Sequence, residues 1–328
     1  MNGNCLVTGA AGFIGSHTVE ALLKRGGTVV GLDNLNDYYN PSRKRSNLAD
    51  LHRSAGTTGR FTFIEGDIRD RKLLGRLFAE HHFDAVVHLA AMAGVRASVA
   101  DPHLYIDVNL TGTVNLLDAA RDHKIANFVF ASTSSAYGNT PRIPFVESDA
   151  CDRPLAPYPA SKRAGEMIGF TYHHLYGQNF TALRFFTVYG PRGRPDMMPH
   201  KVLDNIFFGN EVPLYNNGQM YRDWTFVSDI VSGVVAAADR PLGYEIINLG
   251  RGEPVLLAEF VHTLEQITGK TARLVPSPMM DGDVASTHAD VSKARRLLGY
   301  DPRVSVKEGV MRFWEWYRRA VLDQAWAT

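Results

Sequence analysis

The sequence predicts an α/β fold in which a doubly wound parallel sheet carries a smaller second lobe. In the first half of the chain, short apolar runs such as residues 5–7 and 28–32 alternate with longer segments of helical periodicity. This alternation is typical of parallel strands joined by helical crossovers. The first run leads directly into a glycine-spaced turn at residues 9–15, which a helix-length segment follows. Such sheets bind their ligand at the carboxyl ends of the strands.

The glycine turn predicts a dinucleotide site. Gly9 allows a tight turn, Gly12 lets the backbone approach a pyrophosphate, and Gly15 lets the helix pack closely on its strand. The N–H groups and positive end of that helix favour phosphate. Asp33 ends the second strand about twenty residues further on, where a carboxylate accepts hydrogen bonds from a ribose and repels a 2′-phosphate. We therefore predict a Rossmann-type sheet that binds NAD rather than NADP.

The remaining elements of the sheet follow in chain order. Residues 34–45 form a polar tract that we expect to be a long loop. Further strands are predicted at 61–65, 85–89, 128–131 and 182–186, and helices at 105–123 and 158–176. Asp67 follows a strand, and the small residues Ala90 and Ala91 follow another, where they would let a flat group lie against the backbone.

Beyond Val188 the alternation of strands and helices breaks down. A Pro/Gly-rich segment at 190–195 precedes separated helices predicted at 199–208, 230–238 and 257–268. A strand at 245–249 is expected to return to the sheet. We therefore predict a NAD-binding domain from residues 1–187 with about 225–255, and a discontinuous α/β substrate-binding lobe from about 188–224 with 256–328.

Composition excludes several function classes. The chain has 328 residues, 45% of them hydrophobic, and a formal net charge of +1, so nothing attracts it generally to nucleic acid or to a membrane surface. No apolar stretch approaches membrane-spanning length. The two cysteines and twelve histidines have no metal-ligand spacing, so we expect no metal. The first strand starts at once and leaves no room for a signal peptide, which predicts a cytoplasmic protein.

A tyrosine and a lysine carry the predicted chemistry. Tyr158 and Lys162 are four residues apart, which on a helix places both side chains on one face. An adjacent ammonium and the positive nicotinamide of NAD⁺ would lower the pKa of the phenol and favour its role as a base. The strand that ends at residue 131 delivers four consecutive hydroxyls, Ser132 to Ser135, of which one could pass a proton between substrate and Tyr158.

Five motifs together resemble the extended short-chain dehydrogenase/reductases, within the nucleotide-sugar epimerase group. They are Thr8-Gly9-x-x-Gly12-x-x-Gly15, the hydroxyl run ending in Tyr137-Gly138, Tyr158-x-x-x-Lys162, Leu183-Arg184-Phe185-Phe186 and Tyr221-Arg222-Asp223-Trp224. Three further segments resemble the UDP-glucuronate 4-epimerases, namely residues 33–39, residues 184–197, and Gly282-Asp283-Val284 with the following Thr287-His288-Ala289-Asp290.

The resemblance implies a mechanism. Tyr158, assisted by Thr133, takes the proton of the sugar 4-hydroxyl while C4 gives hydride to NAD⁺, and the 4-keto sugar turns before hydride returns to its other face. Lys162 would hold the nicotinamide ribose. Together the residues and the resemblance predict a cofactor site of Gly9, Gly12, Phe13, Ile14, Gly15, Asp33, Asn34, Asp67, Ile68, Leu89, Ala90, Ala91, Tyr158, Lys162 and Phe185.

The resemblance also implies which residues bind a UDP-sugar. Thr187 and Arg194 resemble a carboxylate clamp, for which the planar fork of arginine is suited. Arg222 would bind the diphosphate and Asp283 the uridine ribose. The other substrate-binding candidates are Arg96, Ser134, Ser135 and Tyr215. Arg192 and Arg194 could alternatively be solvated loop charges.

The substrate and reaction leave alternatives. The resemblance implies conversion of UDP-glucuronate to UDP-galacturonate, and a buried Arg194 without a carboxylate partner would be costly on a neutral sugar such as UDP-glucose or UDP-galactose. Related dehydratases carry Thr-Asp-Glu where this chain has Thr133-Ser134-Ser135, and related UDP-glucuronate decarboxylases carry Glu at Ser135. A non-catalytic NAD-sensing protein would need neither Tyr158 nor Lys162. Family analogy implies a homodimer formed by the helices near 105–123 and 158–176.

Overall fold

A seven-stranded parallel sheet forms the centre of the molecule. The computed structural model describes residues 3–279 and 282–322. The strand order is β3-β2-β1-β4-β5-β6-β11, and every neighbouring pair is parallel. The strands are β1 (Asn4–Thr8), β2 (Thr28–Asp33), β3 (Phe61–Glu65), β4 (Ala85–His88), β5 (Asn127–Thr133), β6 (Phe180–Phe185) and β11 (Tyr244–Leu249). All strands predicted for the sheet are confirmed, including the late return at β11.

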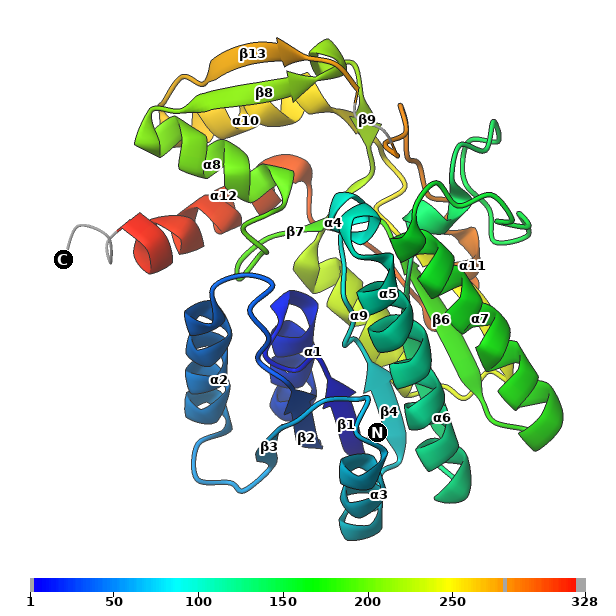
Figure 1. Cartoon of the computed structure of the whole chain (residues 1–328). Helices are drawn as coiled ribbons and strands as arrows, with labels where there is room; N and C mark the ends of the chain where they lie inside the picture. Colours follow the sequence, from blue (N-terminus) through cyan, green and yellow to red (C-terminus); the bar gives the residue numbers. More distant parts are fainter. Residues whose placement is uncertain (1–2, 280–281, 323–328) are drawn as a thin grey trace.

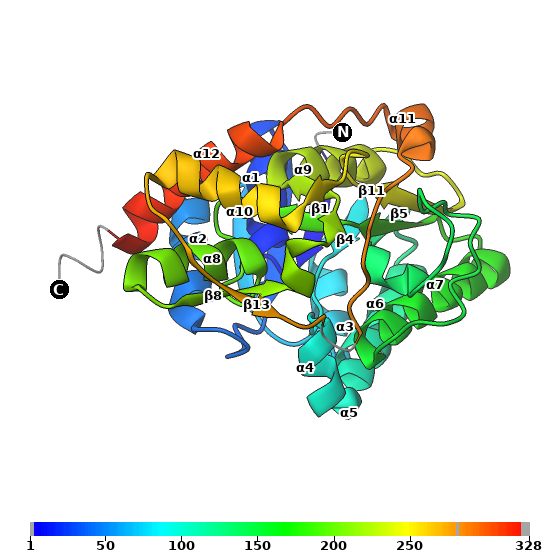
Figure 2. The same ribbon diagram turned by 90° about the horizontal axis from the view of Figure 1, so that it is seen from above.

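Helices cover both faces of this sheet (Figures 1 and 2). One face carries α1 (Phe13–Lys24), α2 (Pro41–Ala55) and α9 (Val227–Ala238), and the other carries α3 (Arg71–Glu80), α6 (Gly112–Asp122) and α7 (Pro157–Tyr176). Alternate residues of β1 join different cores, because Val7 packs with the α1 side and Leu6 with the α3 side. Burial on both faces explains why the strands are continuous apolar runs in the sequence.

The polar tract at 34–45 is only partly the loop that we predicted. Helix α2 begins at Pro41, and the side chain of Asn40 accepts a hydrogen bond from the Ser42 N–H at 3.0 Å. Asparagine at the N-cap followed by proline is a strong signal for the start of a helix. The prediction of a loop through residue 45 is therefore wrong from Pro41 onward, and Lys44 lies within the helix.

The segment predicted as one helix at 105–123 is interrupted. It consists of α5 (Pro102–Ile106), a π-helical turn η1 (Asp107–Thr111) and α6. In this turn the buried Asn109 donates to the carbonyl of Met92 and accepts from its N–H, at 2.9 and 2.8 Å. The irregular turn therefore fixes the segment that follows β4, at the edge of the sheet where a ligand would lie.

A second group of elements lies at the carboxyl end of the sheet (Figure 1). Its helices are α8 (Met198–Phe208), α10 (Leu257–Thr268) and α12 (Val306–Tyr317), so the helices predicted around 199–208 and 257–268 are confirmed. Three two-stranded sheets were not predicted. They pair β7 (Thr187–Tyr189) with β10 (Trp224–Phe226), β8 (Glu211–Tyr215) with β13 (Arg273–Ser277), and β9 (Tyr221–Arg222) with β12 (Val255–Leu256).

Short elements complete the described chain. They are α4 (Val95–Ala100), α11 (Ser292–Leu298), η2 (Ser134–Tyr137), η3 (Asn216–Gly218) and η4 (Arg318–Leu322). Among the described residues, no helix combines the length and the apolar character needed to cross a membrane.

Candidate active site

The glycine turn joins β1 to α1 at the carboxyl edge of the sheet. Gly9 has a φ of +70°, and a Cβ on Gly15 would lie 1.9 Å from the carbonyl oxygen of Gly9. Only glycine therefore fits at the third position, because the turn and the first turn of α1 touch there. Gly12 is the N-cap of α1 and has no side chain to fill the space in front of the helix. This cradle matches the predicted place for a pyrophosphate.

Asp33 connects the end of β2 with the glycine turn. Its carboxylate accepts hydrogen bonds from the N–H groups of Ala11 at 3.1 Å and Leu35 at 2.9 Å. The Nζ of Lys44 lies 3.7 Å from the same carboxylate. A carboxylate has room for further donors, so Asp33 can still accept from a ribose.

Asp67 lies one strand further out, after β3. It accepts a hydrogen bond from the amide of Asn34 at 2.9 Å and forms an ion pair with Arg69 at 2.8 Å. The hydrogen bonds from Arg69 lower the pKa of Asp67 to about 2. Asp67 is therefore ionised at neutral pH and fixes this end of the site.

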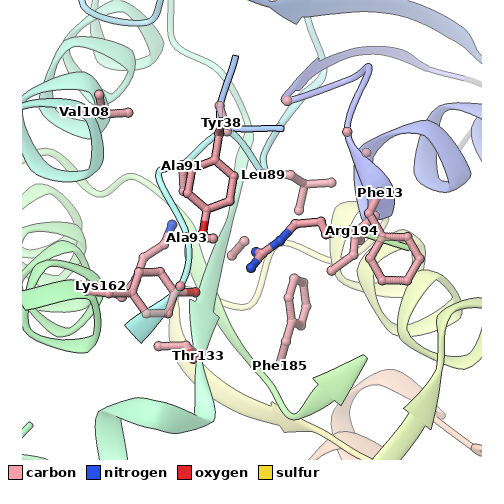
Figure 3. A pocket seen from close by; sticks show the side chains of 18 of the residues that line it. Phe13, Tyr38, Leu89, Ala91, Ala93, Val108, Thr133, Lys162, Phe185 and Arg194 are labelled. Atoms are coloured by element: carbon pink, nitrogen blue, oxygen red, sulfur yellow. The ribbon is translucent and has the colours of Figure 1, made fainter. Parts of the chain in front are cut away.

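One cavity of about 370 Å³ brings the predicted cofactor residues together. All fifteen of them line it, from the glycine turn and Asp33 to Tyr158, Lys162 and Phe185. Figure 3 shows Leu89, Ala91, Thr133, Lys162, Phe185 and Arg194 around the same space. Their placement is the one that the sequence predicted, and their individual roles stay predictions.

Tyr158 and Lys162 lie on the first two turns of α7 and face the cavity with Thr133. Burial raises the pKa of Tyr158, and the nearby Arg194 and a hydrogen bond with Thr133 lower it only in part. Burial lowers the pKa of Lys162 to about 7. In the protein without its cofactor, burial therefore dominates the pKa of both groups, and the predicted lowering of the phenol's pKa by Lys162 together with NAD⁺ stays a prediction.

The state of Lys162 tests whether NAD fits this cavity. Its side chain is 2% exposed, and its Nζ has no hydrogen-bond partner among the residues that the structure describes. The ring of Phe130 lies beside it, with its centroid 4.7 Å from Nζ. An unpartnered ammonium beside a cavity fits a ligand rich in hydroxyls. Together with the glycine cradle and Asp33, it matches a bound dinucleotide.

The two arginines of the loop after β7 point in different directions. Arg192 forms ion pairs with Glu20 at 3.1 Å and Asp50 at 3.3 Å, away from the cavity. Arg194 lines the cavity and points into its middle (Figure 3). Only Arg194 is therefore placed to touch a ligand, and Thr187 lines the same cavity.

Arg194 also has a partner that the sequence reasoning did not consider. Its guanidinium forms two hydrogen bonds with Asp196, at 2.9 Å and 2.7 Å. The argument that Arg194 lacks a carboxylate unless an acidic sugar binds is therefore wrong, because the protein supplies one. Preference for an acidic sugar has to rest on the donors that Asp196 leaves free.

The predicted nucleotide ligands gather in a second group outside the cavity. The guanidinium of Arg96 lies 4.7 Å from the ring centroid of Tyr215 and 3.3 Å from the carboxylate of Asp283. Burial lowers the pKa of Arg222, which Asp283 partly offsets. Arg222 donates to the carbonyls of Tyr221 and Ala285. Among the described residues Arg222 is therefore held by neutral carbonyls and one nearby carboxylate, which leaves a cation suited to a diphosphate.

Ser134 and Ser135 line the cavity. Sequence reasoning missed Asn36, Tyr38 and Lys44, which line it as well. A helix predicted from the Asn40-Pro41 signal would have included Lys44, whose Nζ lies near Asp33. Tyr38 belongs to the segment 33–39, which indicates the family without giving each residue a role. Asp196 lies two positions after Arg194, and no sequence pattern indicates that the two side chains pair.

Fold and site together define the class of the protein. A parallel sheet in the order 3-2-1-4-5-6, a glycine turn after β1 and a Tyr-x-x-x-Lys pair that lines the cavity characterise the extended short-chain dehydrogenase/reductases. The sequence profile described as GDP-mannose 4,6 dehydratase matches residues 6–313, and the chain belongs to that family.

Relatives narrow the comparison further. A UDP-glucuronate 4-epimerase of Thermodesulfobacterium geofontis is 43% identical over 321 residues, which are 97% of each chain. The crystal structure of the Bacillus cereus UDP-glucuronic acid 4-epimerase in complex with UDP-glucuronic acid and NAD is 36% identical, with a TM-score of 0.89 over 96% of this chain and 99% of that one. A UDP-glucose 4-epimerase of Thermotoga maritima with UDP-glucose is 32% identical, with a TM-score of 0.88 over 97% of this chain and 99% of that one.

Proposed function

We propose that the protein is an NAD-dependent 4-epimerase that converts UDP-glucuronate to UDP-galacturonate through a transient 4-keto sugar. The observation that carries this function is the convergence of Tyr158, Lys162, Thr133 and Arg194 on one cavity that also holds the dinucleotide cradle. A sensor of NAD needs no tyrosine and lysine paired on one helix beside its cofactor. Full-length relatives that carry this activity in their names support the choice of reaction.

The residues of the chain would handle the proton and orient the ligands. Tyr158 takes the proton of the 4-hydroxyl, and Thr133, hydrogen-bonded to it, positions that hydroxyl. Lys162 donates to the nicotinamide ribose. When bound, NAD⁺ accepts hydride from C4 and returns it to the opposite face of the sugar. Burial raises the pKa of Tyr158 in the protein alone, so its use as a base would need a nearby positive charge, which the nicotinamide ring would supply when bound.

The remaining assignments concern the UDP-sugar. Arg222 would bind the diphosphate, Asp283 the uridine ribose and Tyr215 the uracil, and Arg96 would bind the sugar carboxylate or the diphosphate. Arg194 and Thr187 would hold the sugar carboxylate, and Ser134 and Ser135 the sugar itself. We assign NAD binding to residues 1–187 with about 225–255 and UDP-sugar binding to about 188–224 with 256–328.

The deciding experiment is an NMR assay of the purified protein with UDP-glucuronate and NAD⁺. We expect UDP-galacturonate to grow to a stable ratio without net formation of NADH or CO₂. A UDP-pentose with CO₂ would instead identify a decarboxylase. No turnover of UDP-glucuronate together with interconversion of UDP-glucose and UDP-galactose would refute the acidic substrate and keep the epimerase.

A substitution tests the base. Tyr158→Phe removes the proton acceptor and leaves the ring, so we expect NAD and UDP-sugar binding to persist while turnover falls by about 10²–10⁴-fold. Activity close to that of the wild type would refute the proposed role of Tyr158.

We further propose a cytoplasmic homodimer. The exposed apolar residues Met167, Phe170, Leu175 and Tyr176 on α7 support a partner helix there. Cys5 and Cys151 are both free thiols, which suits a reducing compartment. A mass measured in solution by light scattering checks the dimer, and a monomer that is active at micromolar concentration would exclude it.

A further inference from the structure

Asp196 forms hydrogen bonds with only one edge of the Arg194 guanidinium. Its two carboxylate oxygens accept from Nε at 2.9 Å and from Nη2 at 2.7 Å, which is the side-on arrangement of an arginine with a carboxylate. A guanidinium has five N–H groups, and this arrangement uses two of them. The end-on fork, formed by Nη1 and the second N–H of Nη2, is not engaged by Asp196.

Tyr38 contacts both members of this ion pair. Its hydroxyl donates to Asp196 at 3.2 Å, and its ring centroid lies 5.5 Å from the guanidinium carbon of Arg194. Gly94 makes this approach possible, because a Cβ at that position would lie 2.6 Å from the Tyr38 hydroxyl. Asp196, Tyr38 and Gly94 therefore confine the arginine to one plane and one direction.

The free end of the fork faces the reaction cavity. Arg194 lines that cavity with Tyr158 and Thr187, and its side chain is 22% exposed. Among the described residues, its Nη1 has no hydrogen-bond partner. Burial alone would raise the pKa of Asp196, but the hydrogen bonds and charge of Arg194 outweigh burial and lower it. Asp196 is therefore ionised when the substrate arrives.

We propose that Asp196 is a positioning residue that fixes Arg194 side-on, so that its end-on fork receives the substrate carboxylate in a set orientation. This inference rests on the proposed function and extends it. The arginine would hold two carboxylates at once, one from the protein and one from the sugar. Because the carboxylate of Asp196 already neutralises Arg194, the site carries no unpaired charge before the sugar binds.

The orientation matters for the keto intermediate. A 4-keto hexuronate is a β-keto acid, and it decomposes when the bond from C5 to the carboxylate lines up with the carbonyl π orbitals. The electron pair of that bond then passes into the carbonyl, CO₂ leaves, and the enolate takes up a proton. A fork held in one plane keeps the carboxylate out of this alignment, whereas a rotating fork would let CO₂ escape.

The test compares Asp196→Asn with the wild-type holoenzyme. The variant keeps the shape of the side chain but loses the charge that holds Nε and Nη2. We expect its affinity for UDP-glucuronate, measured by calorimetry with NAD⁺ present, to fall by about 10- to 100-fold, the range for lost charge-assisted hydrogen bonds. Affinity for UDP should not change. With substrate labelled with ¹³C at C6, we expect CO₂ from a measurable fraction of turnovers.

Asp50→Asn is the matched control. Like Asp196, Asp50 is a carboxylate that pairs with an arginine of this loop, but its partner is Arg192, which lies outside the cavity. We expect wild-type affinity and no CO₂ from this variant. Tyr38→Phe removes only the hydroxyl that holds Asp196, so it should shift both readouts in the same direction by a smaller factor, and it tests the inference if Asp196→Asn does not fold.

Two results would overturn the inference. Unchanged affinity without CO₂ in Asp196→Asn would make the ion pair irrelevant to the substrate. Tighter binding of UDP-glucuronate would show that Asp196 competes with the sugar carboxylate. The wild type in the same assay separates these outcomes from failure of the proposed function, because a wild type that leaves UDP-glucuronate unchanged refutes the function itself.

Discussion

A buried ion pair behind the active site gives the sharpest prediction about stability. Glu166 on α7 and Arg184 on β6 are both completely buried, and their side chains form two hydrogen bonds at 2.8 and 2.9 Å. Ser132 donates to the same carboxylate at 2.5 Å, and Arg163 pairs with it at 3.1 Å. Glu166 follows Lys162 by one helical turn and Ser132 precedes Thr133, so this network ties together the two elements that carry the candidate catalytic groups.

We predict that Glu166→Gln is strongly destabilising. The substitution keeps the side-chain shape but leaves the guanidinium of Arg184 buried without a counter-charge, which typically costs about 3–5 kcal/mol. Unfolding entropy is about 2.1 cal/mol/K per residue, or about 0.7 kcal/mol/K for a chain of 328 residues. The expected fall in Tm is therefore about 4–7 °C.

Calorimetry at fixed protein concentration and pH measures this fall. The double variant Glu166→Leu with Arg184→Met replaces both charges by apolar groups of similar size, and we expect it to recover most of the lost stability. A Tm shift of less than about 1.5 °C for Glu166→Gln would refute the reasoning. A double variant as unstable as the single one would show that packing, not the unpaired charge, causes the loss.

Three further predictions concern the cofactor site. Burial lowers the pKa of Lys162 to about 7, so above that pH the unfolded chain binds more protons than the folded protein. The Tm of the ligand-free protein should therefore rise from about pH 7 towards pH 10. Lys162→Met should remove this part of the rise of Tm with pH, and an unchanged rise would contradict the lowered pKa of Lys162. Gly15→Ala should abolish NAD binding because its Cβ meets Gly9, whereas Gly75→Ala, with open space around it, should keep binding and raise stability by about 0.5–1 kcal/mol. Asp33→Ala should reduce the preference for NAD over NADP in titrations with both cofactors. An unchanged ratio of the two affinities would refute the contact of Asp33 with the ribose.

The sheet and the cofactor cradle were predictable because each leaves a local signal. Burial on both faces makes β1 and β5 continuous apolar runs, and the close contact between Gly15 and Gly9 admits only glycine. The Tyr158–Lys162 spacing needs only a helix to bring both groups to one face. These features depend on neighbours in the chain, so sequence alone places them.

The candidate carboxylate site at Arg194 was only half predictable, because it depends on contacts between segments that are distant in the chain. Arg192 and Arg194 are alike in sequence, and a positive φ of +62° at Arg192 accompanies their divergence. Arg192 turns to Glu20 and Asp50, which lie on helices more than 100 positions away in the chain. The raised pKa of Tyr158 likewise follows from three-dimensional burial, which residue spacing does not report.

The loop that carries Arg194 is anchored to helix α1. His17 on α1 donates from Nε2 to the carbonyl of Pro191 at 2.9 Å, and burial lowers the pKa of that histidine to about 4, so it is neutral at pH 7. Arg192 adds an ion pair with Glu20 on the same helix. The loop that carries Arg194 is therefore fastened to the helix whose first turn forms the phosphate cradle. In the proposed mechanism the sugar C4 and the cofactor must keep a fixed relation for hydride transfer. An Arg194 that binds the sugar carboxylate, as we propose, would be held in that relation by these contacts with α1.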